Sequence, residues 1–168
     1  MRYKYGKLRA LHGKGQGNGS RGKIGIPFGL NMYENLPFWF ELFTRLNFEV
    51  VLSPESSRKL YLKGQRTIPS DTVCYPAKLL HGHVEALVEA GVDAIFYPCM
   101  PYNFNEGVSD NNYNCPVVAY YPELLAANVP SLKKVRYLNP YFGLHRPKDF
   151  ERKASEWFFN ESQVPKRE

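Results

Sequence analysis

The side chains with the widest scope for chemistry in this 168-residue chain are its three cysteines, Cys74, Cys99 and Cys115. Each lies within two residues of a proline, where helices and strands commonly begin or end. Three thiolates from separate loops suit an iron–sulfur cluster better than a zinc ion, because structural zinc sites take four ligands, usually in closely spaced pairs. A [4Fe–4S] cluster held by three cysteines would leave one iron for water, a substrate atom, a histidine or a partner's ligand.

The same three residues also fit a purely structural interpretation. Free cysteine is among the residue types most often buried, where it packs as a small hydrophobe. On that interpretation the three sulfur atoms are far apart and separately enclosed. The spacing along the chain matches no standard ferredoxin pattern, so it does not decide between the two interpretations.

A helix is predicted to begin directly after Cys74. Pro76 suits the first turn, where a missing N–H group is tolerated, and an apolar stripe follows it. The partial positive charge of a helix start favours a nearby thiolate, and Lys78 adds to that charge. His81 and His83 can ligate a metal or carry protons; the simpler expectation is that His81 is solvated and His83 borders the core.

Strand-like and helix-like segments alternate along the chain, which predicts an α/β fold. We expect a three-layer flavodoxin-like or Rossmann-like sandwich with a mostly parallel sheet of four to five strands. Apolar runs predict strands at 23–29, 48–53, 92–98 and 116–122, and a final edge strand within 132–140. Apolar spacing predicts helices at 34–46, 56–63 (capped by Ser53 or Ser56), 76–90, 122–128 and 147–159, and composition predicts a loop at 99–115.

In such a fold, ligands bind at the carboxyl ends of the parallel strands. Cys99 immediately follows a predicted strand and so belongs to that edge, and Cys74, at a turn into a helix, can reach it. Cys115 is harder to place, because a parallel strand at 116–122 would start at the opposite edge. It joins the other two only if that strand is antiparallel, or if Cys115 still belongs to the loop above the carboxyl edge.

Residues 1–22 are predicted to be a flexible, basic, glycine-rich linker, followed by a single α/β domain at 23–168. The net charge of +6 arises at this start of the chain, because residues 1–23 contain seven of the 22 Lys and Arg residues and no Asp or Glu. The remainder is nearly neutral, so we expect no nucleic-acid partner. The glycines do not form a phosphate-binding loop, since no strand precedes them and no Lys–Ser pair follows.

The chain carries no signal for a membrane. No apolar run approaches the ~18 residues of a membrane span, and the basic start lacks the apolar region of a signal peptide. The odd number of cysteines suits a reducing compartment better than a disulfide framework. We therefore expect a cytoplasmic protein.

Three ordered segments resemble one domain of the 2-hydroxyacyl-CoA dehydratase activase-related proteins, a family of CoA-substrate-specific enzyme activases. The segments are KIGIPFGLNMYENLPFWFELFTRLNFEVVLS, TVCYPAKLLHGHVEALVEAGVDAIFYPCM and NCPVVAYYPELL, and the resemblance covers roughly residues 23–150. In that family the domain follows ATPase modules of the actin-like sugar-kinase fold. It is also distantly similar to dehydratase subunits that hold a [4Fe–4S] cluster by three cysteines and leave one iron open.

The resemblance implies an iron–sulfur redox domain that passes an electron from an ATP-driven activator to a dehydratase or reductase acting on an acyl-CoA. Its partners would be an ATPase activator module or subunit and an acyl-CoA dehydratase-like protein. Cys74, Cys99 and Cys115 would ligate the cluster and leave its fourth position open. Further residues would surround the cofactor, namely Lys78 through its charge, His81 as a neighbour, and Tyr75, Tyr97 and Tyr102 as shields.

Two features depart from the family pattern. The chain has no ATPase modules, because no glycine-rich phosphate loop is followed by the acidic residues that such a fold needs. It also ends at Glu168, short of the large family members. We therefore expect an accessory domain, a fragment or a stand-alone subunit that does not itself couple ATP hydrolysis to electron transfer.

Three other functions fit the sequence. The first is a non-catalytic interaction or scaffold domain with structural cysteines. The second is a thiol enzyme in which the helix start and a histidine activate Cys74, although no histidine spacing enforces such a pair. The third is a small-molecule binder that uses the crevice at the sheet edge, with polar contacts from Asn31, Tyr33 and Glu34.

Overall fold

The computed structural model describes residues 10, 18–105, 107–108 and 110–161, and its strands and helices form an α/β fold. Most of the predicted linker, residues 1–9 and 11–17, lies outside the described residues. The strands are β1 (Lys23–Ile26), β2 (Glu49–Leu52), β3 (Ala94–Phe96) and β4 (Arg136–Leu138). The helices are α2 (Met32–Arg45), α3 (Arg58–Gly64), α4 (Tyr75–Glu89), α5 (Pro116–Asn128) and α6 (Pro147–Glu161), with the short 3₁₀ helices η1 (Gln65–Thr67) and η2 (Pro130–Lys134).

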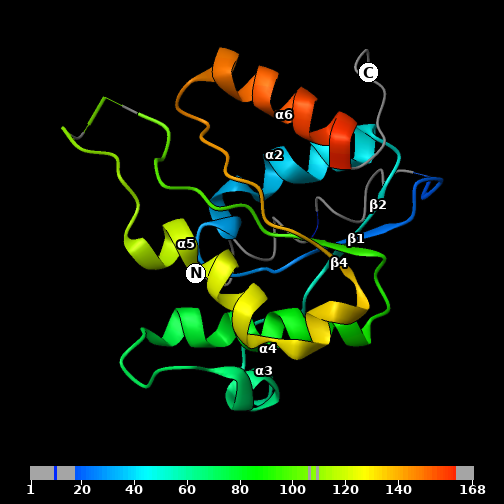
Figure 1. The fold of residues 1–168 in the computed structure, drawn as a ribbon, viewed down its shortest axis with the longest axis vertical. Helices are drawn as coiled ribbons and strands as arrows, with labels where there is room; N and C mark the ends of the chain where they lie inside the picture. Colours follow the sequence, from blue (N-terminus) through cyan, green and yellow to red (C-terminus); the bar gives the residue numbers. More distant parts are fainter. Residues whose placement is uncertain (1–9, 11–17, 106, 109, 162–168) are drawn as a thin grey trace.

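The four strands of the described chain form one parallel sheet in the order β2-β1-β3-β4. Figure 1 shows α2 and α6 on one side of the sheet and α3, α4 and α5 on the other, which confirms the three-layer sandwich. The chain runs from β1 outward to β2 and then crosses back to β3, so the winding reverses between β1 and β3. Doubly wound sheets bind ligands at that point, above the carboxyl ends of the strands.

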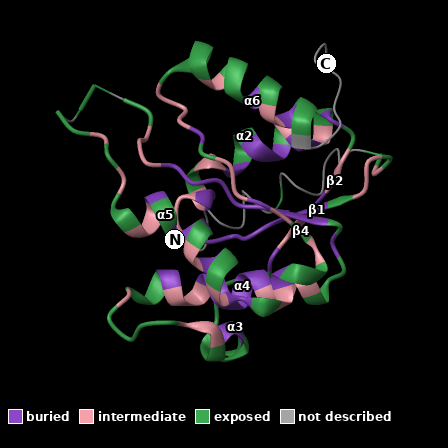
Figure 2. Cartoon of the chain, in the orientation of Figure 1, coloured by how far each residue is buried: buried purple, intermediate pink, exposed green. Residues whose placement is uncertain are grey.

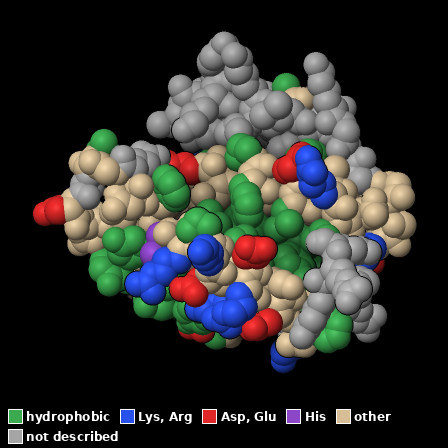
Figure 3. Space-filling model, turned by 90° about the horizontal axis from the view of Figure 1, so that it is seen from above, with side chains coloured by type: hydrophobic (Ala, Val, Ile, Leu, Met, Phe, Trp, Pro, Cys, Tyr) green, Lys and Arg blue, Asp and Glu red, His purple; other side chains and the backbone are tan. Residues whose placement is uncertain are grey.

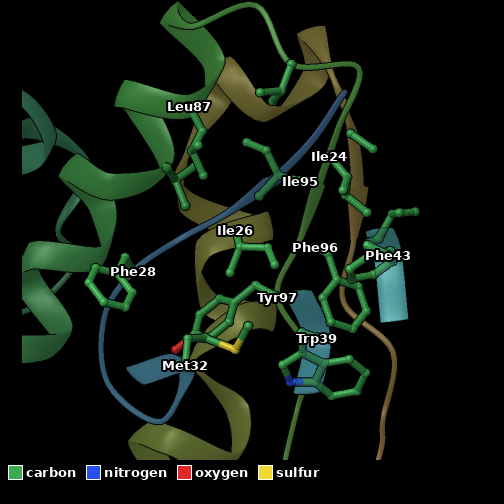
Figure 4. Packing of buried hydrophobic residues seen from close by; sticks show 14 of the residues in the cluster. Ile24, Ile26, Phe28, Met32, Trp39, Phe43, Leu87, Ile95, Phe96 and Tyr97 are labelled. Atoms are coloured by element: carbon green, nitrogen blue, oxygen red, sulfur yellow. The ribbon is translucent and has the colours of Figure 1, made fainter. Parts of the chain in front are cut away.

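An aromatic core fills the space between the sheet and the layer of α2 and α6. Phe96 of β3 lies 4.8 Å from Trp39 and 4.8 Å from Phe43 of α2, measured between ring centroids (Figure 4). Trp157 of α6 covers the same ring at 6.1 Å. Figure 2 shows that buried residues follow the strands and the inward sides of α2 and α4. Burying each side chain of this size contributes about 1.5–3 kcal/mol, so this core fixes the layers.

Three glycines allow close contacts on the opposite face of the sheet. A Cβ at Gly25 of β1 would lie 3.1 Å from the Leu87 side chain of α4. A Cβ at Gly82 of α4 would lie 1.9 Å from the Leu60 carbonyl oxygen of α3, and one at Gly64 would lie 2.2 Å from the Gly82 nitrogen. Helix α3 therefore packs backbone to backbone against α4.

The segment 116–122, predicted as a strand, is the first half of helix α5, and that prediction is wrong. Its β-branched and aromatic residues favour a strand, but Pro116 occupies the first turn of a helix, where its fixed φ fits. Ala119 and Leu125 then lie on the buried side of the helix. Packing against the sheet overrides the local preference, and the change moves Cys115 to a different place in the fold.

The predicted cap of α3 is also wrong. Ser57, not Ser53 or Ser56, is the N-cap, and its Oγ accepts the Leu60 N–H at 3.1 Å. Ser53 and Ser56 lie instead beside the two ring nitrogens of His83, at 2.7 and 3.0 Å. His83 is fully buried, and these hydroxyls replace the hydrogen bonds that water would make.

The outer surface carries mixed charge. On the α6 side of the molecule, Figure 3 shows Lys and Arg side chains interspersed with Asp and Glu around a hydrophobic area. Arg152 and Glu156 pair along α6 at 3.2 Å. Exposed pairs of this kind contribute only about 0–1 kcal/mol each. No helix of the described residues has the length and apolar character needed to cross a bilayer.

Candidate functional site

The three cysteines lie at the carboxyl edge of the parallel sheet. Cys99 follows the end of β3, Cys74 is the N-cap of α4, and Cys115 is the N-cap of α5. Each of these helices leads into the next parallel strand, so each begins at the carboxyl edge and returns to the other. The change of 116–122 from strand to helix is what brings Cys115 to this edge.

No side chain caps either of the two thiol-bearing helix starts. Cys74 and Cys115 share an extended backbone, with φ/ψ of −62°/150° and −61°/154°, and a proline follows in each first turn. The Cys74 carbonyl accepts the Lys78 N–H at 3.2 Å, and the Cys115 carbonyl accepts the Ala119 N–H at 3.0 Å. Both cysteines are exposed, and each lies at the start of a helix, where the partial positive charge favours a nearby anion.

Cys99, in contrast, is buried and held by the chain that follows β4. Its N–H donates to the Pro140 carbonyl at 2.8 Å, and its carbonyl accepts the Phe142 N–H at 3.0 Å. The pKa of the Cys99 thiol is raised to about 11, first by burial and then by the charge of Glu123, while hydrogen bonds from the Glu123 backbone and from Tyr141 lower it. Cys99 is therefore protonated at neutral pH and must release its proton to bind a metal.

The pKa values of two buried tyrosines respond to the charges of the three cysteines. The pKa of Tyr97 is raised well above its ordinary value, first by burial and then by the charges that Cys99, Tyr121 and Cys115 carry when ionised. The pKa of Tyr121 is raised to about 12, first by burial and then by the charge of Cys74. Both phenols are therefore protonated at neutral pH.

The hydroxyl of Tyr97 is unusual among the groups of this region. Its side chain is fully buried, yet its oxygen has no hydrogen-bond partner among the described residues. Leaving a buried hydroxyl unpaired costs about 1–3 kcal/mol. Native proteins usually satisfy such groups with water, an ion or a ligand.

His81 is fully buried, and the simpler expectation that it is solvated is wrong. Thr67 Oγ1 donates to the Gly64 carbonyl at 2.9 Å, so it accepts from Nδ1 of His81, which lies 2.7 Å away. The Tyr121 hydroxyl then donates to Nε2 at 3.0 Å. Burial lowers the pKa of His81 to about 4, so the ring is neutral at pH 7. His81 is thus linked to the cysteine region by its hydrogen bond with Tyr121.

Lys78 and Tyr75, the other predicted cofactor neighbours, contact segments beside the start of α4. Lys78 Nζ donates to the Asp71 carbonyl at 2.7 Å, which closes the loop before the helix. Tyr75 is exposed, and its ring lies 5.5 Å from that of Tyr61 in α3. Among the contacts of the described residues, neither side chain reaches a thiol.

A cavity of about 580 Å³ lies between the start of α2 and the loop of residues 101–114. Tyr33 and Glu34, which were expected to contact a small molecule, line it, but Asn31 is not among the lining residues. Tyr102, expected as a shield for a cofactor, packs against Tyr113 of the cavity wall with ring centroids 4.7 Å apart. One wall of the cavity is thus formed by described residues of the loop that joins Cys99 to Cys115.

In the described part of the chain, no group of three or more His, Cys, Asp or Glu side chains is arranged to hold a metal ion. The three cysteines and the starts of α4 and α5 nevertheless lie at the same edge of the sheet.

Sequence reasoning missed three residues of this region, Tyr121, Glu123 and Tyr141. Tyr121 lies in the segment 116–122 that was wrongly predicted as a strand, whereas Glu123 lies in the predicted helix at 122–128 and was given no role. Tyr141 follows the edge strand β4, in a segment for which no motif was recognised. One available signal was the repeat of a cysteine followed closely by proline, at 74–76 and again at 115–116. That repeat indicates two equivalent helix starts.

The sequence model of one protein family matches residues 23–168, a range that includes every strand and helix named above and all three cysteines. That family is described as the CoA enzyme activase uncharacterised domain. No curated protein and no solved structure matches the chain.

Proposed function

The chain belongs to the family of the CoA enzyme activase uncharacterised domain, and from that premise we propose that it is the iron–sulfur redox domain of an acyl-CoA dehydratase activase-like system. Cys74, Cys99 and Cys115 would hold one [4Fe–4S] cluster, with the fourth iron position open. One observation carries the proposal: the fold collects all three cysteines at the edge of the sheet where doubly wound folds bind ligands.

Each cysteine has a distinct part in holding the cluster. Cys74 and Cys115 are exposed at helix starts, so they are accessible to incoming iron, and the helix dipoles favour an anionic cluster beside them. Cys99 is a rigid ligand, because both of its backbone polar groups bond to the chain after β4. Its proton must leave on binding, so uptake of the cluster becomes more favourable as the pH rises.

The bound cluster would supply one-electron redox chemistry. Because two of its three ligands are exposed, it would lie near the surface, where protein partners can approach. The chain would accept one electron from a reduced ATP-driven activator and pass it to an acyl-CoA dehydratase-like protein. Both partners are inferred from the family description and the sequence resemblance.

Anaerobic reconstitution tests the proposal. The protein, supplied with ferrous iron, sulfide and a reducing thiol and then desalted, should retain about four iron and four sulfide ions per chain and show a broad charge-transfer absorption. Ser70→Ala, an exposed loop variant, is the control and should bind the same amounts. A colourless wild-type protein without iron would contradict the proposal.

A scaffold domain with structural cysteines is the second candidate, and the burial of Cys99 favours it. The same reconstitution separates the two, because a scaffold retains no iron. A thiol enzyme has less support, since both ring nitrogens of His81 and of His83 lie beside hydroxyl groups of other side chains.

A further inference from the structure

We propose that the cavity beside the start of α2 binds a small organic ammonium ion, in which a protonated amine is carried by an apolar ring. The cavity has a volume of about 580 Å³, within the range of ligand-binding cavities in proteins. Glu34, Asn35 and Asn114 would contact the ammonium group, and aromatic side chains would pack against the apolar ring. The inference does not depend on the proposed function, because it involves no cysteine and no metal.

One wall of the cavity is fixed by hydrogen bonds at the base of the loop of residues 101–114, which extends outward from the sheet edge in Figure 1. The Asn103 N–H donates to the Asn112 carbonyl at 2.9 Å, and the Asn114 N–H donates to the Pro101 carbonyl at 2.9 Å. These bonds pair the two arms of the loop in antiparallel fashion. The lining residues at this base are therefore in place before a ligand binds, which lowers the entropic cost of binding.

Two asparagine side chains of the lining have oxygen atoms that can accept hydrogen bonds from a ligand. Asn114 Nδ2 donates to the Met100 carbonyl at 2.7 Å, and Asn35 Nδ2 lies 3.6 Å from the Met100 sulfur. Both Met100 atoms can only accept, so each amide must turn its nitrogen to Met100. Neither amide oxygen has a partner among the described residues. Asn31, one turn before Asn35, likewise directs Nδ2 to this sulfur, at 3.3 Å, and leaves Oδ1 buried and unpaired in the described part of the chain.

The charge of the lining favours a cation. Glu34 is acidic, and no Lys, Arg or His is among the described residues that line the cavity. No described basic side chain forms an ion pair with Glu34. Glu34 lies in the first turn of α2, where its full negative charge outweighs the partial positive charge of the helix start. An anionic ligand would meet this carboxylate and the amide oxygens, whereas a protonated amine supplies positive charge and N–H donors together.

Three aromatic side chains of the lining, Tyr33, Phe104 and Tyr113, suit the same ligand. Phe104 is 57% exposed and Tyr113 is 73% exposed, so a ligand can cover part of each ring. Tyr33 is half-buried and packs edge-on against Phe28, with ring centroids 4.4 Å apart. Aromatic faces attract cations, and covering exposed rings with an apolar group is favourable. These rings therefore favour an ammonium ion that carries an apolar ring over an inorganic cation.

Calorimetric titration of the full chain, without added iron, tests the inference with three ligands of similar shape. Benzylammonium should bind saturably, whereas neutral benzyl alcohol and anionic benzoate should bind at least about tenfold more weakly. Glu34→Gln should weaken the binding of benzylammonium about fivefold, because the negative charge is lost. Glu151→Gln, at an exposed position of α6 outside the lining, is the matched control and should leave binding unchanged.

A second pair of variants tests the aromatic contact. Phe104→Ala should weaken the binding of benzylammonium about threefold, and Phe159→Ala, an exposed phenylalanine of α6, should not change it. Absence of saturable benzylammonium binding overturns the inference, and so does equal binding of benzyl alcohol. Binding that is unchanged in both Glu34→Gln and Phe104→Ala places the ligand elsewhere and also overturns it. None of these outcomes bears on the proposed cluster, which iron reconstitution tests separately.

Discussion

At the scale of single residues, the three cysteines differ in what their surroundings permit. Cys74 and Cys115 are exposed beside positive helix ends, whereas the Cys99 thiol is buried and its pKa is raised to about 11. Assembly of a cluster should therefore begin at the exposed thiols and be completed at Cys99. Because of this difference, substitutions of the three cysteines should have similar effects on iron binding but different effects on the free energy of unfolding.

Alanine substitutions of the three cysteines test both effects. Cys74→Ala and Cys115→Ala should each lower the free energy of unfolding by less than about 0.5 kcal/mol, because surface changes away from packed features have small effects. Cys99→Ala should lower it by about 1–2 kcal/mol, because a buried sulfur is lost. All three variants should lose the reconstituted iron, and urea unfolding with iron analysis checks both effects. Full iron content in any one of them would rule out ligation by three cysteines.

His81 gives a prediction about pH. Its pKa is about 4 when folded and 6.5 in the unfolded chain, so the unfolded state binds the proton first as the pH falls. The stability due to the neutral ring is complete above pH 6.5, declines between 6.5 and 4, and is lost below that range. The total loss is at most about 3 kcal/mol.

The control for this prediction is His81→Gln, which keeps hydrogen-bonding groups and does not titrate. Urea unfolding of both metal-free proteins at several values between pH 7 and 4 gives the comparison. The stability of the wild-type protein relative to His81→Gln should decrease as the pH falls. An identical pH dependence in both proteins would show that His81 is not a buried neutral ring.

The residue types at the site were predictable, but their surroundings were not. The three thiols were recognisable because few side chains share their chemistry. The expectation of a solvated His81 was wrong, because its position on α4 says nothing about Thr67 and Tyr121, which approach from other elements. The unpaired hydroxyl of Tyr97 likewise depends on what the rest of the fold places around it.

At the scale of elements, the arrangement of helix starts decides where the cysteines lie. The prediction for 116–122 was wrong because Val, Tyr and Ala residues in a short run suit a strand as well as a helix. The proline in the first turn and the packing of Ala119 and Leu125 against neighbouring elements favour the helix. With that element corrected, Cys115 moves to the edge that Cys74 and Cys99 occupy.

The contact between α3 and α4 can be tested through Gly82. Gly82→Ala should lower the free energy of unfolding by at least about 3 kcal/mol, because its Cβ would lie 1.9 Å from the Leu60 carbonyl oxygen and backbone atoms must move. Glu85→Ala, at a half-buried position of the same helix, should change it by about 0.5 kcal/mol or less. Chemical denaturation measures both, and similar values for the two variants would contradict the close packing.

At the scale of the whole molecule, the three-layer architecture follows from the alternation of apolar strands and amphipathic helices, and it was predictable for that reason. The number of strands and their parallel order agree with the expectation. The exact ends of the elements, and the cavity beside the loop of residues 101–114, depend on packing between distant segments and were not predictable.

The role of α6 in closing one face of the sheet is testable with two adjacent phenylalanines. Phe158 is buried with its ring 5.9 Å from that of Phe43, whereas Phe159 is 46% exposed. Phe158→Ala should lower the free energy of unfolding by about 3 kcal/mol, and Phe159→Ala by less than about 1 kcal/mol. Calorimetry on both variants measures these losses of unfolding free energy, and equal losses would mean that α6 does not pack on the core as described.

The most direct test of the shared cysteine site is anomalous diffraction at the iron absorption edge, from crystals of the protein reconstituted without oxygen. The proposed function predicts one compact iron peak at the carboxyl edge of the sheet, between the starts of α4 and α5, in contact with Sγ of Cys74, Cys99 and Cys115. Crystals with no iron peak, or with iron bound while one of these three sulfur atoms points elsewhere, would contradict it.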